Sequence, residues 1–282
     1  IDVDLVVIEE KQYKSPTLYR KEEKYFKDAR NWKPQTQVLK CEQGRVNENN
    51  ILSFIMLKQP EVIFTFGCSL LKKELFSIPK KGCINIHTGI VQLFRGVDSN
   101  FWAIHDEKPE GIGATLHYID ESIDAGKIID QKQIDIDIND DLDDLFLKSC
   151  ITGFKLLKKN LDNIKNDKIK TLTLDKKGKL YKNRDRTTQV QEIVDNKLKT
   201  VLEKYVGEKV IDVIMCSYNS EETIAEAVES VLNQTYKKFN LYLFDDHSQD
   251  KTLDILKKYS YDRRLTIISS KENIGTYAAK NY

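Results

Sequence analysis

Short apolar runs that stop at glycine or proline predict the strands in the first two thirds of the chain. The run at residues 61–66 ends at Gly67, and the run at residues 83–87 follows Pro79 and Gly82. Runs of this length, rich in isoleucine, valine and phenylalanine, are typical of strands buried in a sheet. Further strands are expected at residues 2–9, 37–41, 113–120 and after Asp124.

Apolar residues spaced by three and four predict helices between these strands. Helices are expected at residues 47–59, at 99–106 and after Asp140, where acidic residues suit the positive end of the helix dipole. Residues 21–31 are expected to form an exposed, charged helix. Strand, helix and strand in succession imply right-handed crossovers and an open, largely parallel sheet in an α/β fold.

The same alternation begins again after residue 207. Residues 187–206 are expected to form a helical connector. In the following segment, the pattern predicts three strands that alternate with two helices, which indicates a second parallel sheet. A length of 282 residues also exceeds one average domain. The expected organisation is a first domain at residues 1–185, a helical linker at 186–207 and a second domain at 208–282.

The polar residues of the strand at 83–87 give the first candidate for chemistry. Asn85 and His87 are two residues apart and therefore share one face, whereas Ile84 and Ile86 point to the other. A carboxamide and an imidazole at the carboxyl end of a strand can serve as an oxyanion donor and a general base. The alternative is a turn residue or a polar group satisfied within the fold.

Composition limits the classes of function that the chain can have. The 45 basic and 44 acidic residues give a formal net charge of +1, so no overall field favours nucleic acid or a membrane as partner. No apolar run approaches the roughly 20 residues of a membrane span, and no signal peptide is recognised. Five dispersed cysteines favour reduced thiols in the cytoplasm over a disulfide framework or a zinc site. No oligomeric state is predicted.

The motifs occur in a specific order: Asn-x-His at residue 85, Phe-Arg-Gly at 94, Trp-Ala at 102, Gly-x-Thr-x-His at 113 and Asp-x-Gly-x-Ile at 124. In this order and spacing, residues 1–185 resemble the Rossmann-like catalytic domain of the 10-formyltetrahydrofolate-dependent formyltransferases. That family includes enzymes that formylate glycinamide ribonucleotide, methionyl-tRNA and sugar nucleotides. It would supply an earlier strand and helix, so we expect this chain to be a fragment at its N-terminal end.

The resemblance implies roles for individual residues. It places Asn85, His87 and Asp124 in a catalytic triad and leaves His117 either beside the site or against the neighbouring strand. A glycine turn into a helix would explain residues 66–71 nearly as well as a folate site does. The implied binding residues are Phe66, Gly67, Ser69, Leu70 and Gly126 for the folate, and Arg95, Gly96 and Trp102 for the substrate.

The chemistry that the resemblance implies is acyl transfer from 10-formyltetrahydrofolate to a free amine. Asn85 would donate to the oxyanion, and a single such donor is typically worth about 3 kcal/mol. His87 would accept the proton of the amine, and Asp124 would orient the imidazole or relay the proton. The reaction needs neither a metal nor a nucleophilic serine or cysteine.

A second set of motifs follows residue 208: Ser-Tyr-Asn-Ser at 217, Phe-Asp-Asp-His-Ser at 244, and Asn-Ile-Gly at 273 followed by Ala-Lys-Asn at 279. They resemble the first half of a family-2 glycosyltransferase, which has a nucleotide-diphosphosugar-binding, GT-A-like α/β fold. The resemblance places Cys216, Tyr218 and Asp246 at the nucleotide base, with Asp245 close by. The family's divalent-metal ligands and catalytic base would lie beyond Tyr282, so this part is not expected to transfer sugar.

The two resemblances together predict a bifunctional formyltransferase and glycosyltransferase of surface polysaccharide synthesis, acting on a nucleotide-linked amino sugar. The neighbouring glycosyltransferase segment favours a sugar acceptor, and the near-zero net charge disfavours tRNA. Two alternatives stay open. One is a methionyl-tRNA formyltransferase-type activity, and the other is a glycosyltransferase whose formyltransferase-like part only binds.

Overall fold

The computed structural model describes residues 3–10, 21, 36–173, 177–207 and 210–275. Most of the charged helix expected at residues 21–31 and the motif at 279–281 lie outside these ranges. The chain divides into two compact units, residues 1–135 with 140–191 and residues 136–139 with 192–282. Each unit is described by itself.

The first unit alternates short strands with helices, as the sequence pattern predicts. Its strands are β1 (Leu5–Glu10), β2 (Gln37–Glu42), β3 (Ile63–Phe66), β4 (Cys83–His87), β5 (Phe94–Gly96), β6 (Gly113–Tyr118), β7 (Ile128–Gln133) and β8 (Lys179–Tyr181). Its α-helices are α2 (Asn49–Lys58), α3 (Lys73–Phe76), α4 (Ser99–His105) and α5 (Leu142–Lys165). Short 3-10 turns lie at Pro109–Gly111 and Asn183–Asp185, and α6 (Thr188–Gly207) forms the expected connector helix.

The main sheet has the strand order β3-β4-β6-β7. The β3–β4 pair is parallel, as are the separate pairs β1–β2 and β5–β8, which confirms an α/β fold with mainly parallel pairing. The β4–β6 and β6–β7 pairs are antiparallel. The first of these reversals arises because residues 88–112 return to the end of the sheet that they left, where His87 pairs with Thr115.

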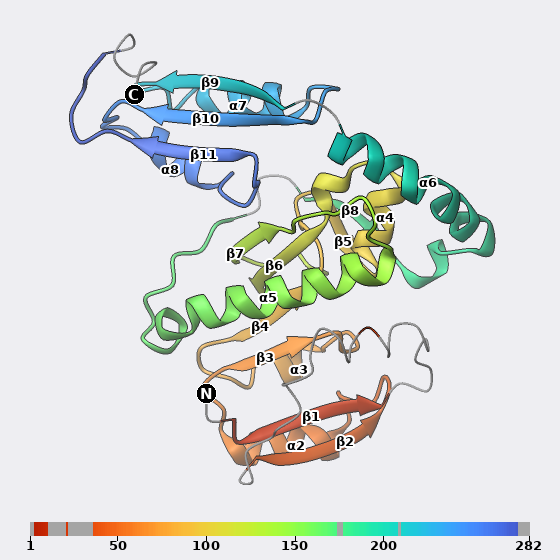
Figure 1. Ribbon diagram of the computed structural model, residues 1–282. Coiled ribbons are helices and arrows are strands. Elements are labelled where there is room, and N and C mark those ends of the chain that lie inside the picture. The colour runs from red at the N-terminus through yellow and green to blue at the C-terminus, as the bar shows by residue number, and fades with distance from the viewer. Residues whose placement is uncertain (1–2, 11–20, 22–35, 174–176, 208–209, 276–282) are drawn as a thin grey trace. The chain divides into compact units, whose positions relative to one another are not determined.

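Helix α5 covers one face of this sheet (Figure 1). It begins at Asp141, whose side chain accepts a hydrogen bond from the Asp144 N–H while the Asp144 carboxylate accepts one from Asp141 N–H, a capping box. Its apolar side packs on Ile84 and Ile86 of β4. Gly153 makes this approach possible, since a Cβ at that position would lie 2.3 Å from Ile86 Cγ2.

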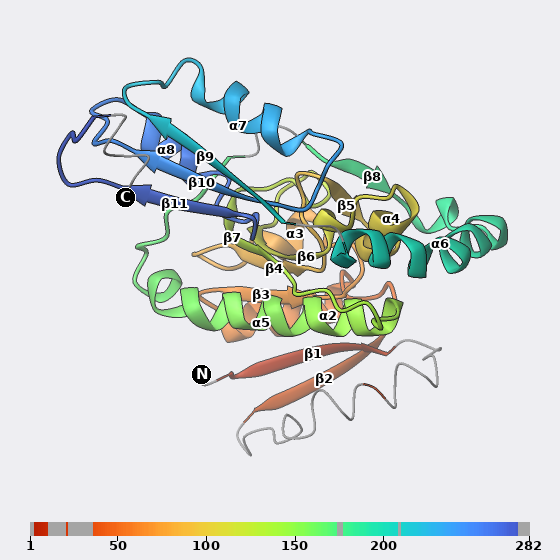
Figure 2. The same ribbon diagram turned by 45° about the horizontal axis from the view of Figure 1, so that its top comes forward.

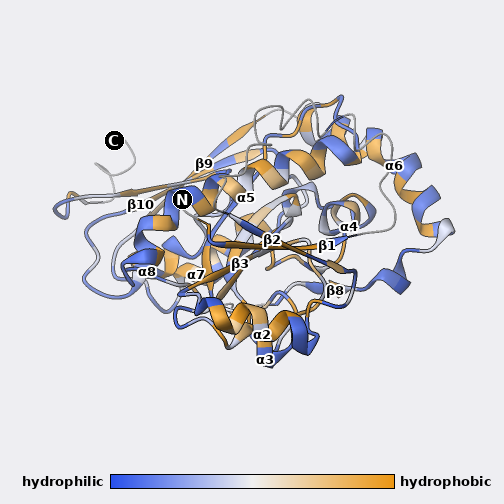
Figure 3. Cartoon of the chain, turned by 90° about the horizontal axis from the view of Figure 1, so that it is seen from below, coloured by the Kyte–Doolittle hydropathy of each residue, from blue (hydrophilic) through white to orange (hydrophobic). Residues whose placement is uncertain are grey.

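A second core lies beneath β1 and β2. Helix α2 buries Ile51, Leu52 and Ile55, and hydrophobic and hydrophilic residues alternate along it (Figure 3). The same core includes Leu75 of α3 and Cys83 of β4. The strand β4 is therefore packed from both directions within this unit.

The second unit contains the strands β9 (Ile211–Ser217), β10 (Phe239–Asp245) and β11 (Leu265–Ser269), in the order β11-β10-β9. All pairs are parallel, as predicted. Helices α7 (Ile224–Leu232) and α8 (Thr252–Lys257) pack against the odd-numbered residues of the strands, which share one face (Figure 2). No described helix in either unit is long and apolar enough to cross a membrane.

The close contact at Gly153 gives a stability prediction. Gly153→Ala is expected to lower the free energy of unfolding of the first unit by about 1–3 kcal/mol through overpacking against Ile86, even though alanine is the better helix former. Urea unfolding followed by tryptophan fluorescence measures this, because Trp102 is buried in the first unit. Lys155→Ala, at an exposed position of the same helix, is the control; a more stable Gly153→Ala protein would contradict the packing.

Candidate functional site

The alternation of β4 places its polar residues opposite the α5 core. Ile84 and Ile86 are buried under α5, whereas Asn85 and His87 emerge on the other face, as predicted. His87 is 7% exposed and Asn85 is half-buried. A helix on one face and a polar pair on the other thus follow from a single five-residue strand.

Asp124 meets this pair from the loop between β6 and β7. Its Oδ2 lies 3.4 Å from His87 Nδ1, and its Oδ1 accepts a hydrogen bond from Asn85 Nδ2 at 3.4 Å. Asp124 has a φ of 46°, in the left-handed region, so its loop turns sharply at this residue. The three residues of the expected triad therefore lie together; their catalytic role stays a prediction.

Arg95 and Gly96 hold the Asp124 loop in place. The Gly96 N–H donates to Asp124 Oδ2 at 2.9 Å, and Arg95 Nη1 donates to the Ile123 carbonyl at 2.9 Å. Arg95 Nε also donates to the carbonyl of Gly178 at 2.8 Å. We expected both residues to bind substrate, and that role stays a prediction; what the structure gives them is the support of the Asp124 carboxylate.

Thr65 orients Asn85, which the sequence analysis missed. The two residues are paired in register between β3 and β4, and Thr65 Oγ1 donates to Asn85 Oδ1 at 2.9 Å. This bond leaves the Asn85 amide hydrogens directed at Asp124. The pairing register of the two parallel strands would have indicated Thr65.

His117 lies beside the site, which decides between the two alternatives left open for it. It is the partner of Asn85 across the β4–β6 pair, and its Nε2 lies 3.3 Å from Asn85 Nδ2 and 3.4 Å from Asp124 Oδ1. Its Nδ1 lies 2.9 Å from the Tyr118 carbonyl, so Nδ1 carries the hydrogen. Two imidazoles thus border one carboxylate.

Burial and this carboxylate set the charge state of the site. Burial lowers the pKa of His87 below its ordinary value, and the nearby Asp124 charge only partly offsets this effect. Burial alone would raise the pKa of Asp124, but His87, His117 and the Gly96 N–H together hold it well below its usual range. At neutral pH the site therefore combines a neutral His87 with an ionised Asp124.

The residues expected to bind folate and substrate differ in exposure. Leu70 is 71% exposed, and the exposed Phe66 contacts Phe154 edge to face. Gly67 has a φ of 57°, and the Ser69 N–H donates to Glu9 at 2.6 Å. Their folate contacts stay predictions.

Gly126 and Trp102 lie in packed positions. A Cβ on Gly126 would lie 1.9 Å from the Tyr118 carbonyl oxygen, so only glycine fits there. Trp102 is 2% exposed and stacks on Tyr181 at 3.8 Å, where it joins α4 to β8. We expected Trp102 to meet substrate, yet the structure places it in the packing because α4 buries nearly its whole length.

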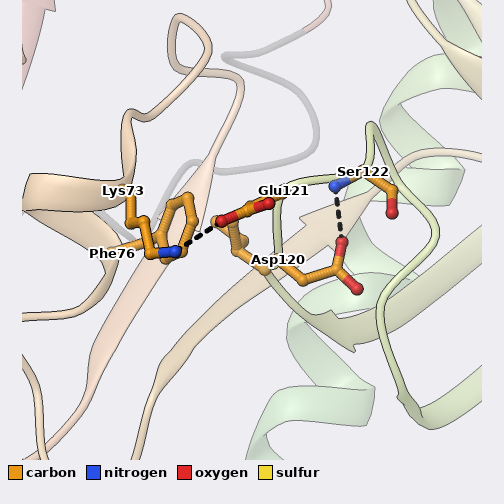
Figure 4. Close-up of a pocket in the computed structure, with 6 residues that line it drawn as sticks. Lys73, Phe76, Asp120, Glu121 and Ser122 are labelled. Carbon is orange, nitrogen blue, oxygen red and sulfur yellow. Dashed lines mark hydrogen bonds and ion pairs between the residues drawn. The ribbon is translucent and has the colours of Figure 1, made fainter.

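A shallow hollow of about 470 Å³ lies beside the chain segment that leads to Asp124 (Figure 4). Within it Lys73 and Glu121 form an ion pair at 2.6 Å, and Asp120 accepts a hydrogen bond from the Ser122 N–H at 2.7 Å. The hollow is lined by Lys73, Phe76, Ile119, Asp120, Glu121 and Ser122.

In the second unit the predicted nucleotide residues gather at the carboxyl ends of β9 and β10. Asp246 is buried, and its carboxylate accepts hydrogen bonds from the Ile274 and Gly275 N–H groups at 2.8 Å each. Asp245 is also buried and accepts from the Ser248 N–H at 3.3 Å, whereas Tyr218 is exposed and Cys216 is half-buried. Within the described ranges, no group of three or more histidine, cysteine or acidic residues could hold a metal ion.

Comparisons with known proteins agree with both motif sets. Residues 2–157 match the family model described as formyl transferase, and residues 212–282 match that of glycosyl transferase family 2. The methionyl-tRNA formyltransferase of Thermodesulfovibrio yellowstonii is 32% identical over 128 residues, which cover 44% of this chain and 41% of that protein. Bacillus subtilis EpsE, described as a glycosyltransferase, is 45% identical over 74 residues, 26% of this chain and 27% of that protein.

A solved structure gives the fold of the first part. The formyltransferase PseJ from Anoxybacillus kamchatkensis, in complex with UDP-4,6-dideoxy-4-formamido-L-AltNAc and tetrahydrofolate, aligns with a TM-score of 0.51 and 20% identity. The alignment covers 71% of this chain and 95% of that one. The chain spans less than half the length of the methionyl-tRNA formyltransferases that it matches.

The lowered pKa of His87 gives a pH prediction. The unfolded chain takes up a proton at histidine near pH 6.5, before buried His87 does, so this residue contributes stability that is present above about pH 6.5 and is lost as the pH falls. In urea unfolding between pH 7.5 and 5, His87→Gln is expected to reduce the slope of unfolding free energy against pH. The exposed His247→Gln is the control; equal slopes for His87→Gln and the unmodified chain would contradict the assignment.

Proposed function

Because the chain belongs to the formyl transferase family, we propose that it transfers a formyl group from 10-formyltetrahydrofolate to the amine of a nucleotide-linked amino sugar. The observation that carries the proposal is that polar atoms of Asn85 and His87 each lie 3.4 Å from the Asp124 carboxylate. A carboxamide donor, a neutral imidazole and an ionised carboxylate are the groups that acyl transfer to an amine requires.

Each residue has a task that follows from its contacts. The bond from Thr65 fixes the Asn85 amide, whose hydrogens can then donate to the oxyanion that forms when the amine attacks the formyl carbon. Neutral His87 can take up a proton from the amine near neutral pH. Asp124, anchored by Gly96, stabilises the imidazolium that results.

Two features of the protein support an amino sugar as acceptor. The second unit matches glycosyl transferase family 2 over residues 212–282, and a glycosyltransferase neighbour suits a sugar that is later polymerised. PseJ, which shares the fold, holds tetrahydrofolate and a UDP-linked formamido sugar. In our proposal the exposed Phe66 and Leu70 meet the folate, and Tyr218 with Asp245 and Asp246 meets the nucleotide of the glycosyl donor in the second unit.

The second candidate function is formylation of methionyl-tRNA. It is favoured by the methionyl-tRNA formyltransferases that are 32% identical to this chain. A protein that binds tRNA usually presents an excess of positive charge, and this chain has a net charge of +1. The low net charge therefore favours an amino sugar over methionyl-tRNA as the acceptor.

The catalytic assignment gives a prediction for single variants. Asn85→Ala, His87→Ala and Asp124→Ala are each expected to lower kcat for formyl transfer by about a hundredfold or more, because each removes a group that acts in the transition state. Asp120→Ala is the matched control. Asp120 lies in the same loop, and its side chain accepts a hydrogen bond from the Ser122 N–H. Full turnover by His87→Ala or Asp124→Ala would remove these residues from the mechanism.

A panel of amines identifies the acceptor. The chain, or the longer polypeptide that contains it, is incubated with 10-formyltetrahydrofolate and either UDP- or dTDP-linked amino sugars, methionyl-tRNA or glycinamide ribonucleotide. Mass spectrometry is expected to show one added formyl group on an amino-sugar nucleotide. A product from methionyl-tRNA alone would overturn the sugar assignment. If no amine gives a product, the result favours the alternative in which the formyltransferase-like part only binds.

A further inference from the structure

Ser99 contacts the reactive imidazole from a position that no motif indicates. It is the first residue of α4, it is 1% exposed, and its Oγ lies 2.9 Å from His87 Nε2. Gly89 makes room for this contact, since a Cβ there would lie 2.5 Å from Ser99 Cβ and 3.1 Å from His87 Nε2. Both nitrogens of His87 therefore have a polar neighbour, Asp124 at Nδ1 and Ser99 at Nε2.

The direction of these two contacts follows from the charge state of the site. An ionised carboxylate only accepts hydrogen bonds, so Asp124, 3.4 Å from Nδ1, favours the hydrogen on that nitrogen of His87. A neutral imidazole has one N–H, which leaves Nε2 with its lone pair. The Ser99 hydroxyl must therefore donate to Nε2.

We propose that Ser99 is a positioning residue that donates its hydroxyl hydrogen to His87 Nε2, and so fixes the ring plane and the Nδ1–H tautomer of His87. The consequence for catalysis rests on the proposed function, in which His87 takes up a proton. A hydroxyl both donates and accepts. Ser99 can thus turn its hydrogen away and accept from Nε2–H once His87 is protonated, with no movement of heavy atoms.

Serine, histidine and aspartate in this order also form the relay of serine nucleophiles. We do not assign that role to Ser99, because direct formyl transfer from the folate to an amine needs no nucleophilic hydroxyl, and the residue is only 1% exposed. Its buried hydroxyl instead satisfies a nitrogen that would otherwise be left without a partner inside the protein. The contact is therefore assigned to the orientation of His87.

The test is ¹⁵N NMR of histidine-labelled chain without any ligand. In the unmodified chain, His87 is expected to show a protonated Nδ1 and an unprotonated Nε2 that receives a hydrogen bond. Ser99→Ala is expected to move the Nε2 resonance toward the value of an unbonded lone-pair nitrogen. Ser149→Ala is the matched control, because Ser149 is equally buried, and its hydroxyl bonds only Asn100 and the Leu145 carbonyl.

The outcomes separate this proposal from the proposed function. Two results would overturn the role of Ser99: a hydrogen on Nε2 of His87 in the unmodified chain, or an Nε2 resonance that Ser99→Ala leaves unchanged. The first of these is measured on the unmodified chain and does not depend on whether the variant folds. With 10-formyltetrahydrofolate and a UDP-linked 4-amino sugar, Ser99→Ala is expected to lower kcat about tenfold, the rate equivalent of one hydrogen bond, with KM unchanged. If the unmodified chain shows the expected tautomer but transfers no formyl group, only the proposed function is contradicted.

Discussion

The fixed position of the Asp124 carboxylate is the constraint on which the candidate site depends. Its two oxygens face two imidazoles and one carboxamide, while the Gly96 N–H anchors it from β5. A buried carboxylate is stable only when such partners compensate for the lost water. Arg95 adds the second anchor by binding the carbonyl of Ile123, the residue before Asp124, and thereby joins the loop to β5 and to Gly178. Loss of these anchors would separate the residues of the site although every side chain of the proposed triad remained.

Strand β4 supplies the other half of the arrangement. The α5 helix approaches closely at Gly153 and fixes Ile86, so the neighbouring Asn85 and His87 must face the opposite side. Thr65 and His117 then flank Asn85 from the two adjacent strands. Packing on one face of a five-residue strand and hydrogen bonds on the other therefore leave Asn85 and His87 little freedom.

Much of this fold could be predicted from the sequence because its strands are short, apolar and bounded by glycine or proline. Strand alternation also predicts that Asn85 and His87 share one face. Thr65 was not predicted and the position of His117 was left open, since both reach Asn85 through pairing register, which hydrophobic pattern alone does not give for these strands. The burial of Trp102 was not predicted for a related reason: it depends on Tyr181 of β8, which is 79 positions further along the chain and stacks on its ring. Ser99 went unnoticed because a serine at a helix start is usually explained by the helix itself.

Transfer of a labelled formyl group is the most direct test of the account. 10-Formyltetrahydrofolate carrying ¹³C in the formyl group is mixed with the chain, or the polypeptide that contains it, and each UDP- or dTDP-linked amino sugar of the acceptor panel, and the ¹³C resonance is followed by NMR. The account predicts that the label leaves the folate and appears as a formamide on the sugar, and that Asp124→Asn suppresses this transfer while Asp120→Asn does not. A label that stays on the folate in the unmodified protein, or that is released only as formate, would contradict it.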